Sequence, residues 1–172
     1  MMRGIMVAAI VGALSLAVGS APESEVDSDS VTAKSGSTQT YAVLKRTKFD
    51  PKAHKISNVG DNVTIVDGTH VMGTDGEMPR YVLVAATVFN DGKWIRLDVS
   101  GCFIPWFKAA PLVRCERDGS IVRVYALLSD GAGAYAVVWQ VRGGQSSREV
   151  FSNDEELIAF VHDRIKRRDE NR

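Results

Sequence analysis

The glycine-containing turn signals constrain the fold of this chain more than any other feature of its sequence. Each signal places an Asp or Asn beside a glycine and lies between two apolar runs. The four signals are Asp67-Gly68, Asn90-Asp91-Gly92, Asp118-Gly119 and Asp130-Gly131. Such residues tolerate the positive φ angles that tight hairpin turns require. Several hairpin signals in one short domain predict an antiparallel β-meander.

The runs between these turns have the composition of strands. Residues 94–99 and 135–141 alternate between two faces, which is the pattern of a strand with distinct inner and outer sides. Residues 81–89 are apolar on both faces. We therefore expect the strand at 81–89 to be central in its sheet and covered on both sides.

The hydrophobic period changes after Phe151, from that of a strand to that of a helix. The apolar positions at helical spacing are Leu157, Ile158, Val161 and Ile165. A capping box is supplied either by Ser152 with Glu155 or by Asn153 with Glu156. We expect a helix over 154–168 that packs on the sheet, because an isolated helix of this length is marginal in water.

These patterns predict an α+β fold. It is a twisted antiparallel β-meander with a C-terminal helix packed on the sheet. A small β-barrel or sandwich with an appended helix is the alternative.

The first forty residues differ in composition from the rest. An uncharged run at 5–18 follows Arg3 and ends in the small residues Val18-Gly19-Ser20-Ala21, as in a secretory signal peptide cleaved after Ser20. Residues 21–40 are rich in Ser, Thr, Asp and Glu, so they cannot bury enough apolar surface to offset their conformational entropy. We predict a signal peptide at 1–20, a flexible acidic tether at 21–40 and a single β-rich domain at 41–172 that ends in a helix. The predicted location is secreted or periplasmic.

The formal charges cancel, with 21 Lys and Arg against 21 Asp and Glu. This balance argues against binding to nucleic acid and against a polybasic membrane-surface protein, since each needs a clear positive excess. No cysteine follows the cleavage site to carry a lipid anchor. We expect no stable membrane insertion once the signal peptide is removed.

Cys102 and Cys115 are the two cysteines of the chain. In an oxidising compartment two such residues are expected to pair, so we predict a disulfide that closes the loop between them. Two prolines stiffen this loop, and its candidate binding residues are Phe103, Ile104, Trp106, Phe107 and Lys108. A stapled loop loses little entropy on binding, which favours a rigid recognition loop. The alternative is that these side chains fold back as a lid on the core.

A second group of residues has the chemistry of hard metal ligands. Asp61, Asp67, His70, Asp75 and Glu77 lie among glycines, and such oxygen ligands could hold calcium. The spacing matches no EF-hand loop, and turn chemistry already explains the Asp-Gly pairs. We therefore predict no metal site.

Ser100-Gly101-Cys102 resembles the Ser-His-Gly-Cys segment of the L,D-transpeptidases, exported enzymes that cross-link bacterial cell wall. The resemblance covers three residues and lacks the histidine of the motif. It implies Cys102 as nucleophile and leaves His70 as the general base. No serine-hydrolase elbow, zinc-protease helix or phosphate-binding glycine loop occurs in the chain. We predict no catalytic residues and no cofactor.

Export, one disulfide, a compact β domain and no catalytic set are together typical of a binding protein. We predict a small exported binding protein, of the inhibitor or immunity type, that acts on another protein through the disulfide-closed aromatic loop. One alternative is a cell-envelope hydrolase or transferase that uses Cys102. Another is a structural, envelope-associated protein.

Overall fold

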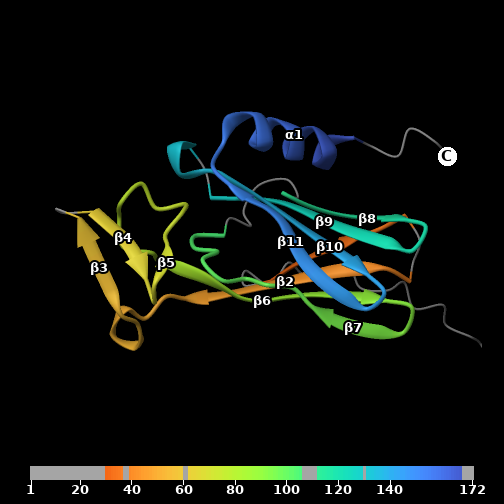
Figure 1. Cartoon of the computed structure of the whole chain (residues 1–172), viewed down its shortest axis with the longest axis horizontal. Helices are drawn as coiled ribbons and strands as arrows, with labels where there is room; N and C mark the ends of the chain where they lie inside the picture. The colour runs from red at the N-terminus through yellow and green to blue at the C-terminus, as the bar shows by residue number, and fades with distance from the viewer. Residues whose placement is uncertain (1–29, 37–38, 60–61, 106–111, 130, 168–172) are drawn as a thin grey trace, which may run out of the picture.

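A computed structural model describes residues 30–36, 39–59, 62–105, 112–129 and 131–167. The predicted signal peptide lies outside these residues and stays a prediction. The described chain consists mostly of antiparallel strands followed by one helix (Figure 1). The predicted α+β class, with a C-terminal helix packed on a sheet, is confirmed.

The first sheet has four strands in the order β1-β2-β6-β7, and all neighbours are antiparallel. Its strands are β1 (Ser30–Lys34), β2 (Tyr41–Lys48), β6 (Tyr81–Asn90) and β7 (Lys93–Arg96). Asp91 and Gly92 form the predicted β6–β7 turn, with φ angles of 48° and 78°. This turn has positive φ at both central residues because Asp and Gly tolerate that region.

The second sheet is a meander of four consecutive strands in the order β11-β10-β9-β8. Its strands are β8 (Val113–Asp118), β9 (Ile121–Leu128), β10 (Tyr135–Arg142) and β11 (Gln145–Ser152). The 3-10 helix η2 (Gly131–Gly133) precedes β10. A Gly143-Gly144 pair joins β10 to β11, and both glycines have positive φ.

A third, smaller sheet lies at one end of the molecule (Figure 1). Its strands are β3 (Ile56–Val59), β4 (Asn62–Val66) and β5 (Thr69–His70), and the 3-10 helix η1 (Pro51–Ala53) precedes them. The predicted signal Asp67-Gly68 forms the β4–β5 turn.

The two four-stranded sheets face each other across one core. Buried residues of both sheets form a single cluster, with Leu44, Leu83 and Val88 from the first sheet and Val124, Val137 and Trp139 from the second. The strands are therefore divided between two layers, as in the sandwich that the sequence left open as an alternative (Figure 1).

Helix α1 (Glu155–Lys166) covers the outer face of the second sheet (Figure 1). Its N-cap is Asp154, whose carboxylate accepts hydrogen bonds from the backbone N–H groups of Glu156 and Leu157, at 2.9 and 3.1 Å. This cap differs from both predicted capping boxes, because the carboxylate of Asp154 already satisfies the free N–H groups of the first turn.

Three expectations about burial are wrong: those for Leu157, for residues 135–141 and for the outer face of residues 81–89. On α1, Val161 is fully buried against the sheet, but Leu157 is 37% exposed and is not part of the apolar face. Strand β10 is buried on both faces because the helix covers its second side. Strand β6 is central as predicted, yet Val84 on its outer face is 52% exposed, since no described element covers that side.

The predicted tether is also wrong in part. Residues 30–34, inside the segment 21–40, form β1 and pair with β2. Val31 and Ala33 alternate with polar neighbours and pack against the shared core, and this burial offsets the entropy of ordering the segment. Among the helices of the described ranges, none is long and apolar enough to cross a membrane.

Candidate functional site

A cavity of about 580 Å³ lies where the end of β2 and the start of β6 meet three connecting segments. We call it the loop pocket. It is lined by Arg46, Gly73, Thr74, Asp75, Glu77, Arg80, Tyr81, Ile104, Pro105 and Ser129. Residues far apart in the sequence therefore form its walls.

Three non-glycine residues with left-handed backbone line the loop pocket, each from a different segment. They are Asp75, Ile104 and Ser129, with φ angles of 49°, 44° and 63°. A β-branched residue such as Ile is rare in this region, because its Cβ crowds the following carbonyl. Such a residue outside a tight turn, as Ile104 and Ser129 are, costs about 1–3 kcal/mol, and this strain tends to gather at functional sites and ligand clamps.

The remaining positive-φ residues make this grouping specific to the loop pocket. Among the described non-glycine residues only Asp67 and Asp91 also have positive φ, and both lie in two-residue hairpin turns. Turn geometry explains those two positions, and it also explains Asp75, because the backbone N–H of Glu77 donates to the carbonyl oxygen of Thr74 across Asp75 and Gly76. Every other described non-glycine residue with positive φ lines the pocket.

Hydrogen bonds from neighbouring strands fix the walls of the pocket. The hydroxyl of Ser129 donates to the carbonyl oxygen of Gly73 at 2.7 Å. The hydroxyl of Tyr135 on β10 donates to the carbonyl oxygen of Phe103 at 2.7 Å. Gly73 leaves no room for a side chain, because an added Cβ would lie 2.8 Å from the Tyr135 ring. The pocket is therefore formed before any ligand arrives.

The loop pocket presents both signs of charge. The buried guanidinium of Arg46 lies 4.4 Å from the centre of the Tyr81 ring and donates to the carbonyl oxygen of Pro105 at 3.1 Å. At the exposed rim, Arg80 and Glu77 form an ion pair at 3.6 Å. The pocket can therefore accept a ligand that carries donors and acceptors together, such as a polar peptide segment.

The loop predicted to bind a partner contributes to this pocket in part. Phe103 is buried and contacts Phe49 edge-on, with ring centres 5.7 Å apart, so it belongs to the core as the lid alternative proposed. Ile104 lies in the pocket wall. Trp106, Phe107 and Lys108 lie outside the described residues.

The acidic residues predicted as possible metal ligands are dispersed. The carboxylate of Asp67 lies 2.6 Å from Nδ1 of His54 and accepts from the backbone N–H of Lys55. Asp75 and Glu77 line the loop pocket, whereas His70 is exposed on β5. Asp61 lies outside the described residues. Within the described part of the chain, no group of three or more His, Cys, Asp or Glu residues could hold a metal ion.

Cys102 and Cys115 are both buried and both free, so the predicted disulfide is not formed. Cys102 lies near Arg148 on β11 and Tyr135 on β10, whereas Cys115 lies on β8.

The thiol of Cys102 does not have the properties of a nucleophile. It is fully buried, and burial raises its pKa to about 12 despite the nearby charge of Arg148. The thiolate is the reactive form, so this thiol stays protonated at neutral pH. The base implied by the transpeptidase resemblance, His70, is exposed on β5, whereas Cys102 is fully buried.

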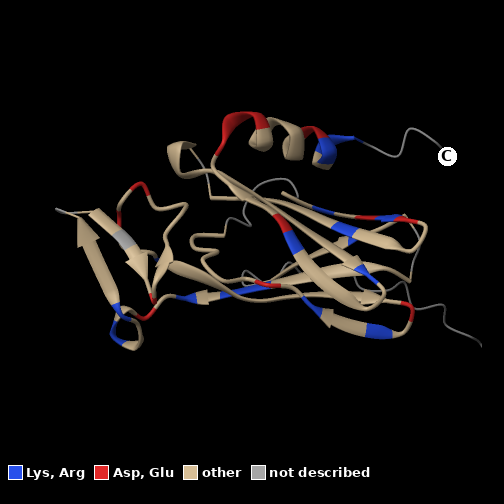
Figure 2. Cartoon of the chain, in the orientation of Figure 1, with Lys and Arg blue, Asp and Glu red and all other residues tan. Residues whose placement is uncertain are grey.

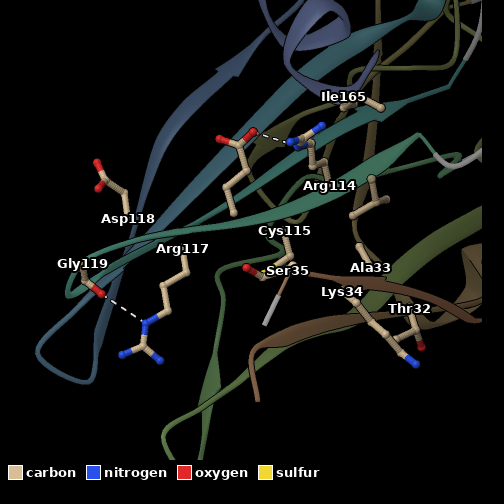
Figure 3. Close-up of a pocket in the computed structure, with 13 residues that line it drawn as sticks. Thr32, Ala33, Lys34, Ser35, Arg114, Cys115, Arg117, Asp118, Gly119 and Ile165 are labelled. Carbon is tan, nitrogen blue, oxygen red and sulfur yellow. Dashed lines mark hydrogen bonds and ion pairs between the residues drawn. The ribbon is translucent and has the colours of Figure 1, made fainter. Parts of the chain in front are cut away.

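A larger groove of about 840 Å³ lies between the edge strands β1 and β8 (Figure 3). Two of its arginines already have protein partners. Arg114 forms an ion pair with Glu116 at 2.7 Å, and Arg117 donates to the carbonyl oxygen of Gly119 at 3.1 Å (Figure 3). We interpret the groove as the open seam between two sheets that do not close into a barrel.

Sequence reasoning missed Arg46 and Ser129. Arg46 carries a usable signal, because it follows Ala42 and Leu44 at strand spacing and so points toward the interior. A cation at an inward-facing strand position marks a buried polar site. Ser129 gives no such signal, since its backbone conformation depends on contacts with distant loops.

No protein-family model matches the chain, and no match was found among curated proteins or solved structures. Fold and pocket alone therefore define the class: a two-layer antiparallel β domain with a helix on one outer face and a preformed polar pocket at one end.

Proposed function

We propose that this protein is a small exported binding protein, of the inhibitor or immunity type, that binds another protein through the loop pocket. The convergence of Ile104 and Ser129, both with strained backbone outside a tight turn, on one cavity carries the proposal. Strain of this kind persists where the surroundings over-determine it, and a rigid site loses little entropy on binding.

The proposal still assigns recognition to the loop after Cys102, but this loop is not made rigid by a disulfide. The Tyr135 and Ser129 hydrogen bonds hold the pocket walls in place of a disulfide. The partner is expected to insert a polar segment, because cations and carboxylates line the same cavity. A hydrolase or transferase that uses Cys102 gains no support from the buried, protonated thiol.

Site-specific photo-crosslinking in the native host tests this proposal. A photo-reactive residue in place of Glu77, which is exposed at the pocket rim, should yield one dominant adduct with another protein. A matched residue at Asp118, in the β8–β9 turn at the opposite end of the sandwich, should not. Charge reversal by Arg80→Glu should remove the adduct formed from position 77.

Equal adducts from both positions would contradict a specific site. If neither position yields an adduct, the structural, envelope-associated alternative is favoured. An adduct from position 77 that survives Arg80→Glu would place the contact outside the pocket.

A further inference from the structure

A row of paired residues crosses all four strands of the first sheet. Lys34 pairs with Tyr41, Tyr41 with Phe89, and Phe89 with Trp94. The three aromatic rings contact one another, with centres 5.2 to 5.4 Å apart. We call these four residues the aromatic row.

The aromatic row faces away from the core. The neighbouring row, Ala33, Ala42, Val88 and Ile95, packs inside the shared core, and strand side chains alternate between faces. Trp94 is accordingly 56% exposed. Helix α1 covers the other sheet, and no described helix or strand lies over this face (Figure 1).

The same sheet carries positive charge alone. Its exposed charged residues are Lys34, Lys45, Lys48, Lys93 and Arg96. Strand alternation places Lys34, Lys45 and Arg96 on the face that carries Trp94. The four strands contain no Asp or Glu, as the colouring of Figure 2 shows. Acidic residues occur in the second sheet and in the helix instead. The formal net charge of the chain is zero, but this sheet has one basic face.

We propose that the outer face of the first sheet docks on an anionic lipid membrane surface. Trp and Tyr rings are favoured at the level of lipid headgroups, where one part is apolar and another is hydrated. Each Lys or Arg near an anionic surface strengthens binding about fivefold, and no carboxylate of these strands opposes it.

The packing of the row favours a membrane over a nucleic acid or another soluble polyanion. Tyr41 and Phe89 are half-buried and stack on each other, so their faces are not free to stack on bases. Val84 is 52% exposed on the same sheet. Burial of its side chain in an apolar medium is favourable, whereas it has no charge or hydrogen-bonding group with which to bind a polyanion. The loop pocket begins at Arg46 and Tyr81, toward the other end of these strands, so the two proposals are independent.

Binding to lipid vesicles tests the proposal. The protein is used in the form in which it accumulates in its host. It should sediment with vesicles of mixed phosphatidylglycerol and phosphatidylcholine, not with phosphatidylcholine alone, and high salt should weaken binding. Trp94→Ala should reduce partitioning about tenfold. Lys45→Glu with Arg96→Glu should reduce it about 25-fold or more, since two favourable charges are lost.

Matched controls come from surfaces away from this face. Phe160→Ala removes an exposed aromatic ring from α1, and Arg142→Glu reverses an exposed charge on β10. Both should leave vesicle binding unchanged. Because any contribution from residues upstream of Ser30 is common to all variants, differences between variants report on the face itself.

Lipids with bromine-labelled chains give a second measurement. It is made on the native protein, so a loss of stability in a variant cannot explain its result. These lipids should quench Trp94 in the native protein, and the quenching should vanish in Trp94→Phe. Equal binding to neutral and anionic vesicles, unchanged binding of the Trp94 and cation variants, or absence of quenching would overturn the proposal. Preferential binding of a single-stranded oligonucleotide or acidic polysaccharide through the same residues would also overturn it.

Discussion

Arg117 on β8 forms a two-pronged ion pair with Asp91 in the β6–β7 turn, with nitrogen–oxygen distances of 2.7 and 3.1 Å. The same guanidinium donates to the side chain of Asn90 at 3.2 Å. One side chain thus joins the second sheet to a turn of the first. The hydrogen bonds from Arg117 lower the pKa of Asp91, and they outweigh the opposing effect of burial.

This contact predicts a dependence of stability on acid pH. A carboxyl group with a lowered folded pKa stabilises the fold above its unfolded pKa, about 3.9, and this contribution is lost as pH falls through the folded value. We expect the urea midpoint of the native protein to fall more steeply below pH ~4 than that of Asp91→Asn. A curve for Asp91→Asn that matches the native curve would contradict this prediction.

The two thiols should be inert until the protein unfolds. Burial raises the pKa of Cys102 and of Cys115 to about 12, so neither forms a thiolate near neutral pH. Iodoacetamide should modify neither residue in the folded protein and both in urea without added reductant, as mass spectrometry would show. Modification in urea only after reduction would demonstrate the disulfide that the structure lacks.

Gly73 should be much less replaceable than Gly68. In Gly73→Ala the new Cβ would lie 2.8 Å from the Tyr135 ring and 3.0 Å from the carbonyl oxygen of Phe103. Gly68 also has positive φ but has open space around it. We expect Gly68→Ala to lose about 1 kcal/mol of unfolding free energy and Gly73→Ala about 3 kcal/mol. Similar losses in urea melts would mean that the pocket wall yields easily.

The helix should contribute to stability through one face only. Val161 is fully buried against β9 and β10, so Val161→Ala should lower the free energy of unfolding by about 2 kcal/mol. Leu157→Ala, one turn earlier and partly exposed, should change it by less than about 0.5 kcal/mol. A reversed order in thermal melts would contradict the described docking of α1.

Trp106 and Phe107 separate the recognition and lid interpretations of their loop. If they bind a partner, replacing both with Ala should leave stability within about 0.5 kcal/mol and weaken binding by about 2 kcal/mol or more. If they belong to the core, each replacement should cost about 3–5 kcal/mol of stability. A urea melt of the double variant decides between them before any partner is known.

Features of the fold that depend on short stretches of sequence were predictable. The turns at Asp67-Gly68 and Asp91-Gly92 form as expected, because their positive φ angles depend on the residues themselves. The Gly143-Gly144 turn could have been found in the same way. The helix was predictable from its period, and only its cap and the position of Leu157 differ.

Features that depend on which elements meet were not predictable. The sequence of β6 is apolar on both faces, yet α1 packs on β10. No pattern within either strand indicates on which sheet the helix packs. The basic face of the first sheet was also hidden. Charge balance along the chain says nothing about how antiparallel pairing sorts Lys45 and Arg96 onto one surface.

Strand β1 has a mechanical consequence. It is an edge strand, joined by a backbone ladder to β2 alone, and the ladder begins at the pair Ser30 and Lys45. Tension applied upstream of Ser30 therefore acts on one residue pair of this ladder at a time. It does not act on all the backbone hydrogen bonds between β1 and β2 at once. The sandwich would open first by unzipping from Ser30 toward Lys34, baring Ala33 and the inner side of β2 while the meander β8–β11 keeps its form.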